Sequence, residues 1–210
     1  MAPKRSPRGR ATPTKRLLAL ALAAAAAGCG GSGAATTNSG GTATISGITG
    51  GPLTVRGLVR IPTPPRIRVF SPAFANGAQI PARYTCTGAD ISPPLRWSGV
   101  PAGTRELALV MLDPDAAGGP FTHWALAGIP PTDRGLPAHL GLLGAVPGRN
   151  DFGKLLYRGP CPPPGKPHHY LIELLALRTP SGLTPGFQIS ALKRLRPLAG
   201  GVLVGAFGRQ

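Results

Sequence analysis

Four apolar runs in the second half of the chain predict β-strands. Residues 107–113 (LALVMLD) are almost continuously apolar, as in a strand buried on both faces. The other three runs have the length and composition of strands and cover 123–129, 169–177 and 201–207. The turn-rich pieces DPDAAGGP and PPTDRG separate these runs and break any helix there. The pattern therefore predicts a mainly β protein.

The best helical pattern is ISALKRLRPLA over residues 189–199, and Pro197 interrupts it. Successive strands with Pro/Gly connections favour a β-sandwich with one or two short helices over alternating βαβ units. We expect the folded domain to cover residues 67–210, which is long enough for one hydrophobic core.

The N-terminal segment has a different pattern. Residues 1–16 carry six basic residues and no acidic one, and residues 17–29 (LLALALAAAAAGC) are apolar. This layout predicts a signal peptide over 1–28, because the apolar run is short for a membrane span. The small residues before Cys29 resemble a lipobox, so we expect Cys29 to be lipidated and to anchor the protein outside the bacterial cytoplasmic membrane. The alternative is a soluble secreted protein.

Residues 29–66, rich in Gly, Ser, Thr and Pro, predict a flexible tether. The net charge is +16, but only +10 follows the predicted signal peptide, and those basic residues are scattered without interleaved aromatic residues. This pattern argues against nucleic-acid binding. Cys86 and Cys161 remain after Cys29 is assigned to lipidation. In an exported chain they form either a disulfide or two free thiols.

Chemically useful side chains gather at the predicted strand ends. Alternation puts His168 and Tyr170 on one face of their strand and His169 on the other. Asp113 and Asp115 follow a buried strand, and His123 begins the next one. A metal site lacks the usual ligand spacing, and a hydrolase lacks a nucleophile motif. The set suits an anion pocket in which the carboxylates orient the imidazoles, and no metal or cofactor is expected.

Two segments, DPDAAGGPFTHW and GRNDFGKLLYRGPCPPPGKPHHY, resemble signatures of the phosphatidylethanolamine-binding protein family, in its bacterial Raf-kinase-inhibitor-like branch. The resemblance covers about residues 67–210. It implies a Greek-key β-sandwich with a small anion pocket, and it carries over Asp113, Asp115, His123, His168 and Tyr170, with Gly159 and Pro160 on the rim. Two positions depart from the pattern: Ala117 stands at a usual proline, and His169 at a usual arginine.

The leading hypothesis is a cell-envelope lipoprotein whose non-catalytic pocket binds phosphate, carboxylates or phospholipid headgroups and modulates a partner protein. His123, His168 and Tyr170 would donate to the ligand, while Asp113 and Asp115 orient the imidazoles. One alternative is a hydrolase or transferase that acts on a phosphorylated envelope substrate. Another is an inhibitor of an envelope protease or signalling protein.

Overall fold

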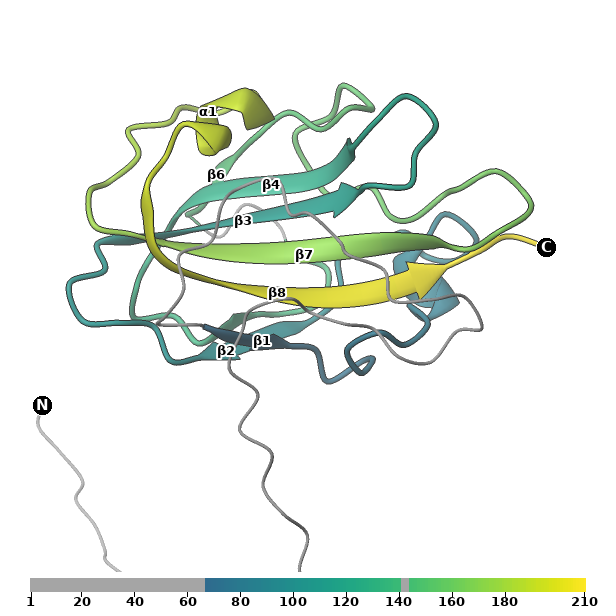
Figure 1. The fold of residues 1–210 in the computed structure, drawn as a ribbon, viewed down its shortest axis with the longest axis horizontal. Coiled ribbons are helices and arrows are strands. Elements are labelled where there is room, and N and C mark those ends of the chain that lie inside the picture. Colours follow the sequence, from purple (N-terminus) through teal and green to yellow (C-terminus); the bar gives the residue numbers. More distant parts are fainter. Residues whose placement is uncertain (1–66, 141–143) are drawn as a thin grey trace, which may run out of the picture. The chain divides into compact units, whose positions relative to one another are not determined.

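The computed structural model describes residues 67–140 and 144–210 of the chain, shown in colour in Figure 1. The signal peptide predicted over 1–28, the lipidation site Cys29 and the tether predicted over 29–66 lie outside the described residues. Within the described part, no helix is long and apolar enough to cross a membrane.

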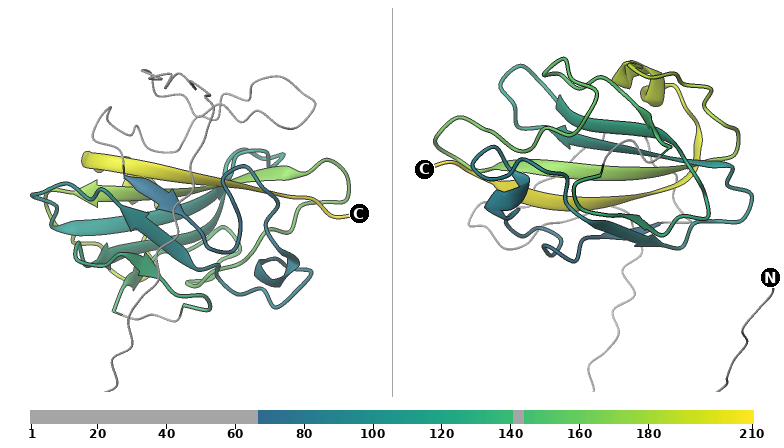
Figure 2. Two further views of the ribbon diagram at one scale, coloured as in Figure 1. Left: turned by 90° about the horizontal axis from the view of Figure 1, so that it is seen from below. Right: turned by 180° about the vertical axis from the view of Figure 1, so that it is seen from behind.

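Two antiparallel sheets form the fold (Figures 1 and 2). The larger sheet has the strand order β6 (Val146–Pro147), β4 (Phe121–Ile129), β3 (Glu106–Asp113), β7 (His168–Leu177) and β8 (Pro197–Phe207). The smaller sheet has the order β1 (Arg68–Phe70), β2 (Leu95–Ser98) and β5 (Gly135–Leu136). The predicted mainly β sandwich is confirmed, and all four strands expected from apolar runs are present.

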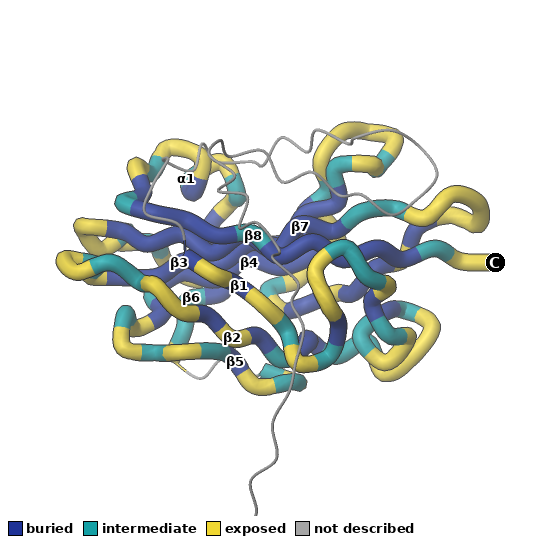
Figure 3. The backbone as a smooth tube through the Cα atoms, turned by 60° about the horizontal axis from the view of Figure 1, so that its bottom comes forward, coloured by how far each residue is buried: buried dark blue, intermediate teal, exposed yellow. Residues whose placement is uncertain are grey.

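The main core lies between the two sheets. Leu109 and Met111 of β3 meet Leu95 and Trp97 of β2 there, and all four side chains are buried. The opposite face of the larger sheet forms a second core beneath the α-helix α1 (Ile189–Lys193). Every residue of β3 is consequently buried, as its continuous apolar run predicts, and Figure 3 shows burial concentrated in the strands and exposure in the loops.

A short 3-10 helix, η1 (Ala82–Tyr84), begins the segment that later supports the pocket. At the edge of the sandwich, β1 approaches β8 so closely that a Cβ on Gly201 would lie only 2.0 Å from the carbonyl oxygen of Ile67. Any side chain at position 201 would therefore push the two sheets apart at this edge.

A β-bulge interrupts the pairing of β3 with β4. Met111 pairs with Trp124, whereas the next residue, Leu112, pairs with Thr122, so His123 is an extra residue without a partner in β3. Such an insertion disturbs the alternation of side chains along the bulged strand. Because of the bulge, His123 contacts Tyr170, which belongs to the core between the two sheets. Trp124, the next residue of β4, belongs to the same core.

Candidate functional site

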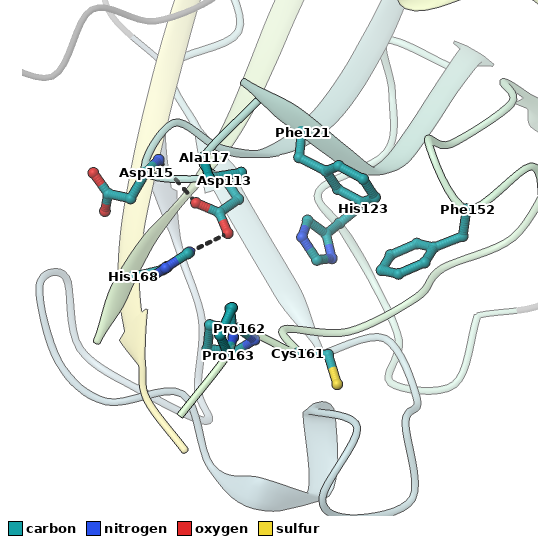
Figure 4. A pocket seen from close by; sticks show the side chains of 11 residues that line it. Asp113, Asp115, Ala117, Phe121, His123, Phe152, Cys161, Pro162, Pro163 and His168 are labelled. Carbon is teal, nitrogen blue, oxygen red and sulfur yellow. Dashed lines mark hydrogen bonds and ion pairs between the residues drawn. The ribbon is translucent and has the colours of Figure 1, made fainter. Parts of the chain in front are cut away.

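Three strand ends meet at one end of the larger sheet. Asp113, the last residue of β3, pairs with Phe121, the first residue of β4, and Leu112 pairs with Leu171 near the start of β7. A cavity of about 310 Å³ opens at this point (Figure 4). Its polar lining includes two carboxylates and two imidazoles, namely Asp113, Asp115, His123 and His168.

Asp113 holds His168 through one of its carboxylate oxygens. His168 Nδ1 lies 2.7 Å from Asp113 Oδ2, and the backbone N–H of Asp115 donates to Asp113 Oδ1 at 2.9 Å. The Asp113 side chain is only 5% exposed, so solvent screens this pair weakly. Because the carboxylate accepts, Nδ1 of His168 carries a hydrogen, and Nε2 is the ring nitrogen left for a ligand.

His123 is held by the backbone behind the pocket. Its Nδ1 lies 2.8 Å from the carbonyl oxygen of Arg158 and 3.1 Å from that of Gly159. Carbonyl oxygens only accept, so Nδ1 is the protonated nitrogen of this ring. Burial lowers the pKa of His123, although the Arg158 carbonyl and the Asp113 carboxylate act in the opposite direction. His123 is therefore a neutral imidazole at neutral pH.

Asp115 does not orient a pocket imidazole, which corrects the role expected for it. Its Oδ2 accepts hydrogen bonds from the backbone N–H and Nδ1 of His169, each at 2.7 Å. His169 lies on the opposite face of β7 from His168, as alternation predicts. Figure 4 shows the Asp115 carboxylate directed away from the cavity. Asp115 thus fastens the β3–β4 turn to the start of β7.

Tyr170 lies behind the pocket, which corrects its expected role as a donor to the ligand. The residue is fully buried, and its ring packs edge-on against His123 with centroids 5.2 Å apart. Its hydroxyl lies near the Asp113 carboxylate without reaching standard hydrogen-bond geometry. Burial, and then Asp113, raise the pKa of Tyr170 far above its usual value, so the phenol stays neutral.

Gly159 and Pro160, expected on the rim, are not among the residues that line the cavity, and the N–H of Gly159 already has a partner. It donates to Asp90 Oδ1 at 2.7 Å, while Cys86 N–H donates to the Pro160 carbonyl at 3.1 Å. A Cβ on Gly159 would lie 2.5 Å from the Tyr84 carbonyl oxygen, so only glycine fits this approach. Gly159 thus helps to hold His123 through its carbonyl oxygen, while Pro160 joins the segment to Cys86.

Further contacts fix this rim to residues 84–90. Cys86 and Cys161 form a disulfide, which decides between the two states that the sequence left open. Tyr157 donates to the Tyr84 carbonyl at 2.6 Å. Burial, followed by the Asp90 carboxylate, raises the pKa of Tyr157 well above its usual value, so it remains a donor. The segment that carries the two carbonyl acceptors of His123 is thus tied down from several sides.

Two aromatic side chains that the sequence analysis did not select form one wall of the pocket. Phe121 and Phe152 have ring centroids 4.8 Å apart, and each packs edge-on against His123. The loop that carries Phe152 is built on buried Asn150, whose side chain donates to the Leu156 carbonyl and accepts from the Lys154 N–H. The opposite side is lined by Cys161, Pro162 and Pro163. The pocket therefore surrounds its polar groups with apolar walls.

The donor set does not suit a metal ion. Over residues 67–140 and 144–210, no group of three or more His, Cys, Asp and Glu side chains is arranged to hold one. Each carboxylate near the cavity already binds a histidine, and each of these histidines uses Nδ1 in doing so. The arrangement instead presents two imidazole Nε2 atoms to one small cavity.

Comparison with known proteins supports the resemblance seen in the sequence. Residues 70–199 match the family model described as phosphatidylethanolamine-binding protein. The chain belongs to the phosphatidylethanolamine-binding protein family. Among its relatives in this family, a protein named UPF0098 from Methanothermobacter thermautotrophicus is 50% identical over 119 residues, which cover 54% of this chain and 78% of that protein.

Two other relatives add information on context and fold. The candidate lipoprotein LppC of Mycobacterium tuberculosis is 40% identical over 158 residues, covering 73% of this chain and 78% of LppC. The crystal structure of Escherichia coli YbcL, described as a member of the mammalian family, matches with a TM-score of 0.65 and 32% identity, covering 70% of this chain and all of YbcL. The family fold is therefore shared at substantial identity.

Proposed function

We propose that this family member is a cell-envelope protein whose pocket binds a small anion, such as phosphate, a carboxylate or a headgroup, without catalysis. One observation carries the proposal: Asp113 and two backbone carbonyls fix the rings of His168 and His123 from behind, and both rings line one cavity. Ring nitrogens fixed in advance bind a ligand without a cost for ordering the side chains.

The walls of the cavity strengthen the interaction. Phe121, Phe152 and Pro162 exclude water from the space beside the imidazoles, and a charge interaction is stronger where less water screens it. The carboxylate of Asp113 holds the His168 ring through Nδ1, which leaves Nε2 for an anion in the cavity. Asp113 thus acts on the ligand through His168.

The absence of catalysis is part of the proposal. The described residues that line the cavity include no serine, threonine or lysine, and Cys161 is held in a disulfide. A hydroxyl, thiol or amine nucleophile activated by a neighbouring base is therefore missing among them. Turnover of p-nitrophenyl phosphate that is lost in His168→Ala would overturn this part and favour the hydrolase alternative.

Attachment to the membrane is the second part of the proposal. A basic segment, an apolar run and small residues precede Cys29, and the relative LppC carries a lipoprotein name. We infer that Cys29 becomes the lipid-modified N-terminus, which places the pocket near anionic lipid and any envelope partner protein. Mass spectrometry of the mature N-terminus tests this, since an unmodified start at another residue would refute it.

Binding is tested by titrating the purified protein with phosphate, phosphoethanolamine and acetate while following histidine NMR signals. We expect the signals of His123 and His168 to shift with at least one of these anions. His139, exposed in a loop outside the pocket, is the internal control and should not move. No shift of His123 or His168 with any of the three anions would refute the proposal.

A further inference from the structure

The two pocket imidazoles are locked in the same tautomer. His123 Nδ1 faces two backbone carbonyls and His168 Nδ1 faces a carboxylate, so each Nδ1 carries a hydrogen. Among residues 67–140 and 144–210, neither Nε2 makes a hydrogen bond. Each Nε2 can donate only when its ring takes up a second proton, and it is otherwise an acceptor.

The surroundings of His123 disfavour that second proton. The titratable and charged groups near the ring are the carboxylates of Asp113 and Asp151, the phenol of Tyr170 and residue Arg158. Burial outweighs the two carboxylates and lowers the pKa of His123. The Nε2 of His123 is therefore a bare acceptor at neutral pH, and it repels an oxygen that carries no hydrogen.

Two arginines lie close to residues of the cavity wall without lining the cavity: Arg158, and Arg209, whose Nη1 is 3.8 Å from Cys161 Sγ. The described residues that line the cavity include neither lysine nor arginine. The nearby guanidinium of Arg158 lies 5.9 Å from the Phe152 ring centroid and pairs with Asp90 at 3.3 Å. The buried Asp113 carboxylate also lines the cavity. A doubly charged ligand would therefore place one more negative charge beside this carboxylate than a singly charged ligand does.

We propose that the pocket binds phosphate monoesters in their singly charged form, with the ligand O–H donating to His123 Nε2 and a ligand O⁻ accepting from His168 Nε2–H. The inference rests on the proposed anion binding and narrows it. A phosphate diester, as in an intact phospholipid, has no O–H to donate and leaves His123 Nε2 against a bare oxygen. The ligand class is a terminal phosphate, on a small molecule or on a lipid.

This pairing requires proton uptake. The second pKa of a phosphate monoester is about 6, so the free ligand at pH 8 is mostly a dianion and must gain a proton to bind. A diester gains none. Any proton taken up by His168 is common to both ligands and cancels in the comparison between them.

The test compares methyl phosphate with dimethyl phosphate by isothermal titration calorimetry, in buffers of different ionisation enthalpy. At pH 8 we expect methyl phosphate to take up about one proton more than dimethyl phosphate, and its affinity relative to the diester to fall about tenfold from pH 7 to 8. At pH 6, where about half of the monoester is singly charged, we expect dimethyl phosphate to bind at least about fivefold more weakly. Phosphatidic acid and phosphatidylethanolamine vesicles extend the comparison to lipids, with binding expected only for the former.

A His123→Gln variant should bring the two affinities within about threefold and abolish the difference in proton uptake, because its amide NH2 can donate to a bare ligand oxygen and the monoester no longer has to gain a proton. Thermal unfolding checks that this variant is folded, and the comparison of the two ligands on the wild-type protein stands without it. Equal binding of both esters by the wild-type protein, or equal proton uptake, overturns the inference while anion binding survives. Binding of neither ester, together with phosphate and acetate that leave the histidine signals unmoved, overturns both proposals.

Discussion

Replacing Asp113 by Asn tests the central interaction of the site. In Asp113→Asn, the oxygen of the new amide would still accept from the Asp115 N–H, which is 2.9 Å from Oδ1 in the wild-type protein. The nitrogen of that amide, however, would face His168 Nδ1 where the carboxylate Oδ2 now lies at 2.7 Å. The substitution therefore preserves the turn but removes the negatively charged acceptor of His168 Nδ1.

The size of the effect follows from this contact. A hydrogen bond to a charged group contributes about 1.5–3 kcal/mol, and the Asp113 side chain is too buried for solvent to replace it. If the full amount were lost from anion binding, Kd would rise about 10- to 150-fold, since 1.4 kcal/mol corresponds to a factor of ten. The amide also favours the reversed tautomer of His168, which donates from Nε2 as a weaker neutral group. We therefore expect Kd for phosphate to rise about tenfold or somewhat more.

The assay is a phosphate titration followed by calorimetry at pH 7. Asp133→Asn is the matched control, because Asp133 follows β4 at its other end and its side chain makes no hydrogen bond within the described residues. We expect the control to keep wild-type affinity. Unchanged or tighter binding by Asp113→Asn, with wild-type thermal stability, would refute the reasoning that Asp113 supports anion binding through His168.

Three further predictions concern the supports of the pocket. Replacing Cys86 and Cys161 together by Ala should lower the free energy of unfolding by about 4 kcal/mol in urea, because the bond joins residues 75 apart; a loss under about 1 kcal/mol would contradict this. Tyr170→Phe should leave phosphate affinity within about twofold, since the hydroxyl is buried, and a tenfold loss would show that the phenol reaches the ligand. The pKa of His123 is lower in the folded protein than its unfolded value of 6.5, so the unfolded chain takes up this proton first as the pH falls. The free energy of unfolding should therefore fall as the pH drops below 6.5. Urea unfolding at about pH 7.5 and 5.5 measures this fall, which should be smaller in His123→Gln than in the wild-type protein.

The sequence predicts the strands well because their signals are local. The apolar run that became β3 is buried along its whole length, and the alternation after His168 separates it from His169 as expected. The helix stops near the predicted place, since α1 ends at Lys193 and β8 begins at Pro197. Periodicity and proline suffice for such features, because each depends on only a few neighbouring residues.

The interior of the site depends on contacts between distant segments, which no local pattern encodes. The position of His123 results from a bulge against β3 and from carbonyls 35 and 36 residues away. Tyr170 shares a face with His168, but alternation cannot tell that the phenol is sealed behind the ring of His123. Phe152 lies inside one of the two family-like segments, and its role in the wall becomes visible only through the loop built on Asn150.

The two departures from the family pattern meet in one interaction. Ala117 lacks the fixed φ of a proline, so the turn after Asp113 has to be held by other means. Asp115, in the same turn, accepts two hydrogen bonds from His169, the residue that stands at the usual arginine. The turn is thereby joined to the first residues of β7, and the backbone N–H of Asp115 in turn binds Asp113 Oδ1. His169, at the position of the usual arginine, therefore supports through Asp115 the carboxylate that fixes His168 in the pocket.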